Sequence, residues 1–473
     1  MLGFCPVSSI IRGVSLLLFD KEFDKEFDRE FRGSRLNTDP NKTINVGICG
    51  LGTVGGGTLS LLENNRADIE AKLGCSIEVT RVATRTLRPE VIAAFSGAGT
   101  DLFDVVNDPD VDIVVETVGG FDPAFELVKT ALSNGKHVVT ANKALIAERG
   151  NELFPVAEAN GVTLAFESAV AGGIPIIKAL REGLAANRID SLAGIINGTG
   201  NFILTEMTDK QSQFEGVLKE AQDLGYAEAD PAFDIEGTDA AHKLTIMASI
   251  AFGIPLQFDK TYTEGISHIE PEDILYAGEL GCVIKHLGIA RRSEKGVEMR
   301  VHPALIEKSR LLGNVHGVGN AVVVHGNEVG STLYSGPGAG AGATASAVVA
   351  DLIDIARQIQ AGASTPFIPA LGYCRENEGL EVLSIDEIES EYYLRILVSD
   401  VVGVLAGISG KLEKLAISIE AVIQKEAAGN LASIVILTHS ALESQLNIAI
   451  AEIEAMDEVS GAVKRIRVAG FED

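Results

Sequence analysis

A lysine and a group of carboxylates in the middle of the chain have the types and spacing that acid–base chemistry requires. Asp239 and Lys243 are four residues apart, which places them on one face of a helix. Glu228, Asp230 and Asp234 precede them in a polar loop. In a closed cleft, Asp239 could set the charge and position of Lys243, which could then donate a proton to a developing alkoxide. The alternative is an ordinary surface ion pair, which is the usual meaning of this spacing.

A glycine-rich turn near the start of the chain has the spacing of a dinucleotide-binding site. The apolar run 45–49 leads into Gly50-Leu51-Gly52-Thr53-Val54-Gly55, and an amphipathic segment follows. Gly50 would allow a tight turn, Gly52 would let a pyrophosphate approach the backbone, and Gly55 would let helix and strand pack closely. The free N–H groups and dipole of the helix would favour the phosphates. The alternative is an ordinary glycine-rich turn between a strand and a helix.

The second predicted strand, 77–83, ends without the acidic residue that would hold the ribose 2′-hydroxyl of NAD. Arg85 follows it instead, and a guanidinium suits the 2′-phosphate of NADP. We therefore expect NADP as the cofactor, with NAD possible. A solvated surface arginine is the alternative meaning of Arg85.

Strands and helices alternate through residues 43–166, as in a doubly wound α/β sheet. The near-continuous apolar run 111–117 predicts a parallel strand buried on both faces, and further strands are predicted at 136–140 and 162–167. Ligands bind at the carboxyl ends of such strands, where Thr117, Asn142 and Lys143 lie. We expect a Rossmann-type dinucleotide-binding domain at 43–166. A helix at 345–360, in the region 330–360, is expected to return to it.

The rest of the chain predicts two further domains. Residues 167–329 hold a strand at 189–197, the helix with Asp239 and Lys243, and several short strands after residue 260, which indicates an α+β substrate-binding and dimerisation domain. Residues 361–391 are predicted to be a linker. Residues 392–473 then alternate as βαββαβ, a split βαβ arrangement. Residues 1–42 are expected to be a poorly ordered extension.

The bulk composition excludes several classes of function. A net charge of -27 argues against a nucleic-acid binder, which needs Lys and Arg to neutralise phosphates. The five cysteines are scattered and odd in number, which indicates reduced thiols in a cytoplasm and no zinc site. No apolar run is long enough to cross a membrane. We expect a cytoplasmic protein that acts on a small molecule.

Several motifs, taken together and in order, resemble one enzyme family. They are the glycine turn, Thr140-Ala141-Asn142-Lys143, Asn197-Gly198-Thr199-Gly200-Asn201, Gly225-Tyr226-Ala227-Glu228-Ala229-Asp230-Pro231 and Asp239-Ala240-Ala241-His242-Lys243. With them, residues 43–470 are similar to homoserine dehydrogenase with a C-terminal ACT regulatory domain. The resemblance implies reversible NAD(P)H-dependent reduction of L-aspartate 4-semialdehyde to L-homoserine in threonine, methionine and isoleucine biosynthesis. It also implies a homodimer or homotetramer.

The resemblance assigns roles to individual residues. Lys243 would donate the proton with Asp239 as its partner, and Lys143 would face both substrate and nicotinamide as the second candidate donor. Glu228 would hold the substrate amino group. The same pocket would include Gly198, Thr199, Tyr226 and Asp234. The cofactor would contact the glycine turn, Arg85, Thr117, Lys143 and Gly340, the last of which would close over it.

The resemblance also implies a monovalent-cation site, for Na+ or K+, at the bend after the strand 162–167. Its ligands would be Glu167, Val170, Gly172 and Ile174, mostly through backbone carbonyls, and oxygen ligands suit such a hard cation. The alternative is a tight glycine turn, which the segment needs in either case.

The ACT resemblance rests on Val398-Ser399-Asp400-Val401-Val402-Gly403-Val404-Leu405. Asp400 is a suitable helix N-cap, and Gly403 would let a ligand approach the first turn of that helix. Threonine, bound near Asp400, Gly403, Val404 and Leu405, is the expected effector because it is an end product of the pathway.

Two other functions remain as alternatives. The chain could be a cofactor-bound amino-acid sensor that has lost catalysis, although the presence of Lys243, Asp239 and Glu228 argues against this. It could also be a related aldehyde or hydroxy-acid dehydrogenase. An enzyme that reduces acyl phosphates would need a nucleophilic cysteine, and neither Cys49 nor Cys75 is well placed for that role.

His242 falls on another part of the helix from Lys243, and we expect a structural role for it.

Overall fold

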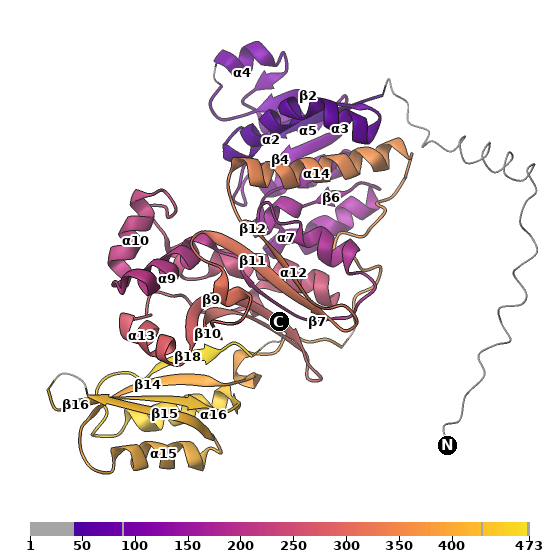
Figure 1. Cartoon of the computed structure of the whole chain (residues 1–473). Helices are drawn as coiled ribbons and strands as arrows, with labels where there is room; N and C mark the ends of the chain where they lie inside the picture. The colour runs from indigo at the N-terminus through magenta and orange to yellow at the C-terminus, as the bar shows by residue number, and fades with distance from the viewer. Residues whose placement is uncertain (1–41, 88, 378, 427–428, 471–473) are drawn as a thin grey trace, which may run out of the picture.

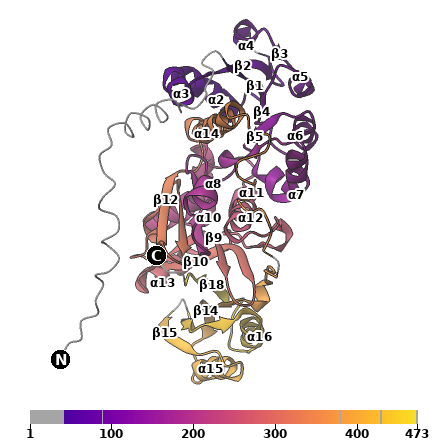
Figure 2. The same cartoon turned by 90° about the vertical axis from the view of Figure 1, so that its right-hand side faces the viewer.

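Three layers of structure follow one another along the long axis of the molecule, from the glycine turn at one end to the βαββαβ segment at the other (Figures 1 and 2). This computed structural model describes residues 42–87, 89–377, 379–426 and 429–470. The predicted extension at 1–42 therefore lies, apart from Lys42, outside the described residues. None of the described helices is both long enough and apolar enough to cross a membrane.

The first layer is a parallel sheet of six strands in the order β3-β2-β1-β4-β5-β6. The strand order changes direction between β1 and β4, which makes their carboxyl ends the switch point where ligands bind. The predicted doubly wound sheet is confirmed. Its strands are β1 (Thr43–Cys49), β2 (Ser76–Ala83), β3 (Ala98–Gly99), β4 (Ile113–Glu116), β5 (His137–Thr140) and β6 (Leu164–Ala165).

Helices from two distant parts of the chain cover this sheet. The local ones are α2 (Thr53–Asn64), α3 (Arg66–Leu73), α4 (Pro89–Ala94), α5 (Leu102–Asn107), α6 (Ala124–Ser133) and α7 (Lys143–Ala159). The returning one is α14 (Ala341–Gln360), which lies among the first helices in Figure 1. Its Val348, Leu352 and Ile355 are buried in one cluster with Ile44 and Val46 of β1. The predicted returning helix is confirmed and begins four residues earlier than 345.

The middle layer places helices against a mixed sheet. Its helical segments are η1 (Glu167–Ala169), α8 (Ile176–Lys178), η2 (Ala179–Gly183), α9 (Gly198–Lys210), α10 (Phe214–Asp223), α11 (Ala232–Ile235), α12 (Thr238–Phe252), η3 (Phe258–Lys260), α13 (Pro271–Glu279) and η4 (Leu312–Asn314). Its strands are β7 (Ile189–Ile195), β8 (Tyr262–Thr263), β9 (Cys282–Arg292), β10 (Val297–Glu307), β11 (Gly319–Gly326) and β12 (Gly330–Pro337).

The prediction of only short strands after residue 260 is wrong, because β9 and β10 each have 11 residues. Buried polar side chains hide this length in the sequence. Lys285, His286, Glu298, Arg300 and His302 interrupt the apolar runs, yet all five are almost fully buried.

The last layer has the predicted βαββαβ order. Its elements are η5 (Ile385–Glu387), β13 (Glu389–Ser390), β14 (Tyr392–Ser399), α15 (Val404–Lys414), β15 (Ile419–Glu426), β16 (Leu431–Thr438), β17 (Ala441–Leu442), α16 (Glu443–Glu454) and β18 (Lys464–Val468). One detail of the prediction is wrong. The N-cap of α15 is Gly403, at φ 99° and without a side-chain cap, so Asp400 lies too far upstream to cap the helix.

The second and third layers share one sheet. β18 pairs parallel with β10 and antiparallel with β14, giving ten strands in the order β12-β11-β7-β9-β10-β18-β14-β16-β15, with β8 beside β10. The βαββαβ segment (the C-terminal module) is therefore joined to the middle layer by main-chain hydrogen bonds.

Candidate active site

Asp239 lies between the two predicted catalytic lysines. Its Oδ2 is 2.7 Å from Nζ of Lys243, and its Oδ1 is 3.1 Å from Nζ of Lys143. The Asp239 and Lys243 side chains are 6% and 11% exposed, whereas Lys143 is 31% exposed. The structure thus joins two lysines that are a hundred residues apart in the chain to one buried carboxylate.

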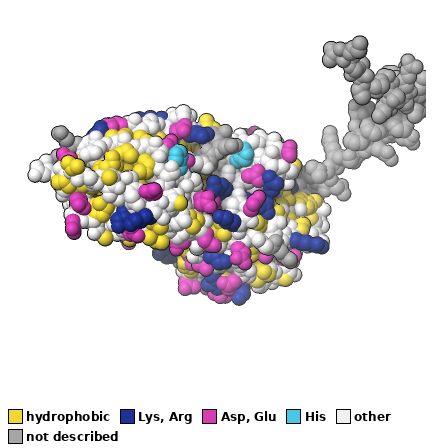
Figure 3. Space-filling model, turned by 90° about the horizontal axis from the view of Figure 1, so that it is seen from below, with side chains coloured by type: hydrophobic (Ala, Val, Ile, Leu, Met, Phe, Trp, Pro, Cys, Tyr) yellow, Lys and Arg dark blue, Asp and Glu magenta, His cyan; other side chains and the backbone are white. Residues whose placement is uncertain are grey.

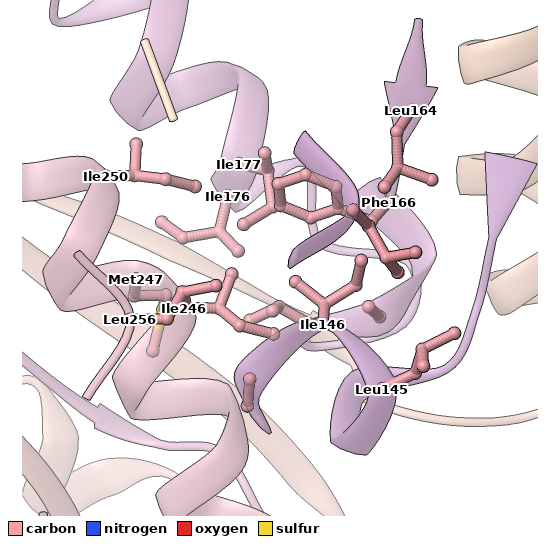
Figure 4. Packing of buried hydrophobic residues seen from close by; sticks show 14 of the residues in the cluster. Leu145, Ile146, Leu164, Phe166, Ile176, Ile177, Ile246, Met247, Ile250 and Leu256 are labelled. Atoms are coloured by element: carbon pink, nitrogen blue, oxygen red, sulfur yellow. The ribbon is translucent and has the colours of Figure 1, made fainter. Parts of the chain in front are cut away.

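Two helices position these side chains. Lys143 is the first residue of α7, and Asp239 and Lys243 lie in the first turns of α12. Behind them the helices share a hydrophobic core, in which Ile146 of α7 and Ile246 of α12 point inward (Figure 4). Because this core fixes both helix starts, it fixes the distance between the lysines.

The carboxyl ends of β4 and β5 hold the start of α7. Glu116 accepts hydrogen bonds from the backbone N–H groups of residues 118 and 119 and from the Thr140 hydroxyl. Asn142 caps α7 by accepting from the backbone N–H of Leu145, and its amide donates to the Gly120 carbonyl. Lys143 therefore begins a helix whose N-terminus disfavours a cation, and the nearby Asp239 offsets that effect.

Asn197 belongs to this site, although sequence reasoning gave it no role. Its amide Nδ2 lies 2.8 Å from carboxylate oxygens of both Asp234 and Asp239, and its Oδ1 caps α9. Lys243 also donates to the Ile196 carbonyl at 2.7 Å. The signal in the sequence is an asparagine at a strand end, directly before a glycine-rich helix start.

The two carboxylates beside Asn197 have opposite electrostatic environments. Burial alone would raise the pKa of Asp239, but Lys243 and Lys143 together hold it well below its usual value. Burial and the neighbouring Asp239 raise the pKa of Asp234. Asp239 thus stays ionised beside its lysines, and Asp234 is the easier of the two to protonate.

The predicted substrate loop lies against α9. The Thr199 hydroxyl donates to the Tyr226 carbonyl at 2.8 Å, so Gly198, Thr199 and Tyr226 are brought together. Glu228 follows on the exposed part of the loop, and among the described residues its carboxylate makes no hydrogen bond. The structure does not join Glu228 to the Asp239 cluster.

His242 is buried, as expected for a structural residue. Its Nε2 lies 2.9 Å from Oε1 of Glu148, and its ring stacks on Phe258 with centroids 4.2 Å apart. Burial lowers its pKa.

The glycine turn has the geometry that each glycine was predicted to provide. Gly50 adopts φ 99°, and a Cβ there would come within 2.7 Å of the Thr117 carbonyl. A Cβ at Gly55 would come within 2.0 Å of the Gly50 carbonyl, whereas a Cβ at Gly52 would meet nothing within 4 Å. The Thr117 hydroxyl donates to the Gly50 carbonyl at 2.8 Å. The open space at Gly52 fits a phosphate that approaches the backbone.

The other predicted cofactor residues surround this turn. Arg85 is exposed just beyond β2, which neighbours β1 in the sheet. Gly340, at φ 111°, directly precedes α14, and a Cβ at Gly57 of α2 would meet the Ala341 carbonyl at 2.6 Å. The start of α14 therefore lies against α2, close to the turn.

Two family models match the chain. The model described as homoserine dehydrogenase, NAD binding domain, matches residues 50–167, and that described as homoserine dehydrogenase matches residues 175–353. The homoserine dehydrogenase of Pseudomonas aeruginosa is 56% identical over 432 residues, which cover 90% of this chain and 99% of the relative. That of Neisseria gonorrhoeae is 53% identical over 435 residues, covering 91% and 100%.

The chain belongs to the homoserine dehydrogenase family. A solved homoserine dehydrogenase from Thiobacillus denitrificans is 56% identical with a TM-score of 0.87, covering 90% of this chain and 98% of that one. A hyperthermophilic archaeal homoserine dehydrogenase, solved in complex with NADPH, is 28% identical with a TM-score of 0.57, covering 66% and 98%. The activity is therefore that of an NAD(P)-dependent homoserine dehydrogenase, which interconverts L-aspartate 4-semialdehyde and L-homoserine.

The bend predicted to bind a cation surrounds the buried Glu167. Its carboxylate accepts from the backbone N–H groups of Ile177 and Lys178 at 2.9 Å, and Asp351 lies close by. Burial, aided by Asp351, raises the pKa of Glu167 to about 8. Two successive residues, Ala171 and Gly172, have φ of 54° and 53°, and a Cβ at Gly172 would meet the Gly338 carbonyl at 2.5 Å. The carboxylate oxygens of Glu167 and Asp351 are hard ligands that suit a monovalent cation, and the left-handed turn needs Gly172 with or without one.

The predicted effector residues lie at the start of α15. Asp400 and Leu405 are exposed, Val404 is buried, and the side chains of Val401 and Val402 face solvent. Figure 3 views the molecule from the side of the C-terminal module and shows a patch of hydrophobic side chains at the left of this face.

A cavity of about 670 Å³ lies elsewhere, at the opposite ends of α7 and α12. It is lined by Phe154, Arg181, Gly253 and the segment 365–376. None of the predicted catalytic or substrate residues lines it, so its size does not make it the active site.

Proposed function

We propose that Lys243 donates the proton in the reduction of L-aspartate 4-semialdehyde by this homoserine dehydrogenase. The observation that carries the proposal is the bonding of its ammonium group. Nζ has three N–H donors, of which one reaches Asp239 and one reaches the Ile196 carbonyl. The third remains for the carbonyl oxygen of the substrate. Lys143 is more exposed and has one carboxylate contact, which makes it the second candidate.

The other residues of the cluster hold this arrangement. Asp239 keeps positive charge beside the substrate, and Asn197 orients Asp239. Glu228 binds the substrate amino group from the exposed loop, with Gly198, Thr199, Tyr226 and Asp234 forming the pocket wall. The nicotinamide supplies the hydride. Holding the aldehyde against it contributes at least as much as the proton donor, because fixed orientation removes an entropic cost.

The test is the oxidation of homoserine, followed by the absorbance of reduced nicotinamide. Lys243→Ala should lower kcat by about 10²–10⁴-fold and leave cofactor affinity unchanged, and Lys143→Ala should affect kcat less. Lys219→Ala, an exposed helix lysine, is the matched control. Near-normal turnover in Lys243→Ala would move the donor role to Lys143. A parent chain that binds cofactor but has no turnover would favour an amino-acid sensor.

We further propose that NADP is preferred over NAD. Arg85 follows β2 where NAD-specific sites carry an acidic residue, and a homoserine dehydrogenase with a related fold was solved with NADPH. Arg85→Ala should reduce kcat/KM for NADP about tenfold, through loss of a charge-assisted contact, and leave NAD unchanged. Equal loss for both cofactors would refute this role.

We propose that Na+ or K+ binds at Glu167, Val170, Gly172 and Ile174. The support is the buried carboxylate pair of Glu167 and Asp351 beside the left-handed turn. Activity and thermal stability should be higher in KCl or NaCl than in choline chloride of equal ionic strength. Identical curves in all three salts would exclude the site.

We propose that the C-terminal module is an ACT domain at which threonine regulates the enzyme, and that the enzyme is a cytoplasmic homodimer or homotetramer. The βαββαβ order and the left-handed Gly403 at the start of α15 support the ACT domain. The exposed apolar residues near that helix start support the assembly. The four free thiols among the described residues support the cytoplasmic location. Threonine should inhibit the parent and inhibit Asp400→Ala less. Light scattering should give two or four chains per particle, and a monomer would contradict the assembly.

A further inference from the structure

Phe233 is only partly buried, although it lies beside the catalytic cluster. It belongs to α11, directly before Asp234, and its exposed fraction is 43%. Phe258, by contrast, packs against the hydrophobic core. A ring as exposed as that of Phe233 gains only part of the free energy that full burial would provide. Its position therefore depends on the particular groups that it contacts.

The face of the Phe233 ring contacts the ammonium group of Lys143. Nζ of Lys143 lies over the ring, 5.4 Å from its centroid. An ammonium within about 6 Å of the centroid is attracted to the electron-rich face of an aromatic ring. The same Nζ is 3.1 Å from Oδ1 of Asp239. The ammonium group thus lies between a carboxylate and a ring.

A stack of three rings fixes the position of Phe233. Its ring lies against that of His242, with centroids 5.7 Å apart, and His242 stacks in turn on Phe258 at 4.2 Å. Nε2 of His242 donates to Oε1 of Glu148 at 2.9 Å. His242 and Glu148 belong to α12 and α7, the two helices whose first turns form the catalytic cluster. The stack is therefore anchored on the elements that carry the lysines.

The middle ring of this stack is uncharged near neutral pH. Burial lowers the pKa of His242, and the positive charge of Lys143 lowers it further. A neutral imidazole does not repel an ammonium group. His242 can therefore hold Phe233 beside Lys143 without weakening the contact between them.

We propose that Phe233 is a positioning residue, which holds the ammonium group of Lys143 against Asp239 through a cation–π contact. Fixing a lysine side chain costs rotamer entropy. The carboxylate provides one contact from α12, and the ring provides a second from α11, so Nζ is confined to the space between them. This inference rests on the proposed function, in which Lys143 faces both substrate and nicotinamide.

Fluorinated phenylalanines at position 233 test the contact with little change in the shape of the ring. Each added fluorine withdraws charge from the ring face and weakens its attraction for an ammonium group. The mono-, di- and trifluoro forms, incorporated by stop-codon suppression, should lower kcat/KM for homoserine progressively, to about a third to a tenth of the parent value. Equal kcat/KM in all forms, at an unchanged thermal midpoint, would overturn the proposal.

Ordinary substitutions separate the ring face from apolar bulk. Phe233→Tyr keeps the ring face and should retain parent kinetics, whereas Phe233→Leu keeps apolar volume and should lower kcat/KM about three- to tenfold. Phe367→Leu, at an exposed phenylalanine in the segment after α14, is the matched control and should change nothing. Phe233→Leu should have no further effect in the Lys143→Ala background. An equal loss in both backgrounds would mean that Phe233 acts independently of Lys143, and would overturn the proposal.

Chemical labelling measures the position of Lys143 without turnover. An amine-reactive ester, with the labelled peptides quantified by mass spectrometry, should modify Lys143 about twofold faster or more in Phe233→Leu than in the parent. The exposed Lys219 should react equally in both. Faster labelling with unchanged kcat/KM would confirm the contact but overturn the role of Lys143 in the proposed function, and with it the positioning role. Unchanged labelling would overturn the contact itself.

Discussion

Asp239 divides its two carboxylate oxygens between lysines that differ in environment. Lys243 is nearly buried and held by two acceptors, while Lys143 is partly exposed and lies 5.4 Å from the centre of the Phe233 ring. A proton donor needs a fixed position. A residue that faces both cofactor and substrate needs to be open to the space in which these two molecules bind. The distribution of contacts suits Lys243 to the first task and Lys143 to the second.

Glu228 should act in binding rather than in chemistry, because its carboxylate is exposed and separate from the Asp239 cluster. Glu228→Gln should raise the KM for homoserine roughly tenfold or more, as expected for losing a hydrogen bond between charged groups, and change kcat little. Steady-state kinetics in both reaction directions would measure this. A fall in kcat at constant KM would place Glu228 in the chemical step instead.

For single residues, the sequence predicted contacts between residues that are close in the chain and missed contacts between residues that are distant. Asp239 and Lys243 were predicted because a helix brings positions four apart together. The contact of Lys143 with Asp239, and the bridge from Asn197 to Asp234, depend on how α7, α9 and α12 pack. Asp400 was assigned as an N-cap from residue type alone, and backbone geometry gave that position to Gly403.

Different glycines of the glycine turn serve the packing of the protein and the binding of the cofactor. Of its three glycines, Gly55 is required by the protein itself, since an added Cβ would overlap the Gly50 carbonyl. Gly52 is not required for packing, because space surrounds it. The sequence pattern predicted a different role for each glycine, and the structure adds the distances at which an added Cβ would meet its neighbours.

Alanine substitutions should separate these roles. Gly52→Ala should keep the thermal midpoint and weaken NADP binding at least tenfold, because its methyl group occupies the space of the pyrophosphate. Gly55→Ala should cost about 1–3 kcal/mol of stability by overpacking. Gly56→Ala, whose Cβ would approach nothing closer than 3.9 Å, is the control and should be neutral or stabilising. If Gly52→Ala bound NADP normally, the phosphate would have to lie elsewhere.

Elements were predicted best where their hydrophobic pattern is continuous. β4 and β5 are short strands with continuous apolar runs at 113–115 and 138–139, and they were found close to their true limits. β9 and β10 were predicted as shorter pieces because buried ion pairs, such as Arg300 with Glu298, satisfy polar residues inside the sheet. A polar residue in a sequence does not reveal whether a distant partner will be present.

At the scale of the whole molecule, β18 joins the middle layer to the C-terminal module. Arg467 on this strand is 1% exposed, and it pairs with Glu443, also 1% exposed, and with Glu264. This junction was not predicted, because the alternation 392–473 is complete as βαββαβ and gives no sign that its last strand has a second neighbour.

Arg467→Met should therefore destabilise the protein strongly. Removing one partner of a buried ion pair leaves the other charge uncompensated and costs about 3–5 kcal/mol. Chemical denaturation with separate probes for the two parts would measure the loss. Arg188→Met, which breaks an exposed pair with Asp190, is the control and should change stability little. If Arg467→Met cost no more stability than Arg188→Met, the buried ion pair would contribute no more than an exposed one.

The return of α14 to the first sheet has a consequence for synthesis of the protein. All six strands of that sheet exist once residue 165 has been made, yet the helix that covers Ile44 and Val46 comes only at 341–360. Since ribosomes add about 5–20 residues per second, α14 is synthesised roughly 10–35 s after the sheet, and this apolar face stays unburied during that time. Elongation speed between the two segments, and chaperones that shield the waiting face, should therefore influence how much folded enzyme a cell obtains.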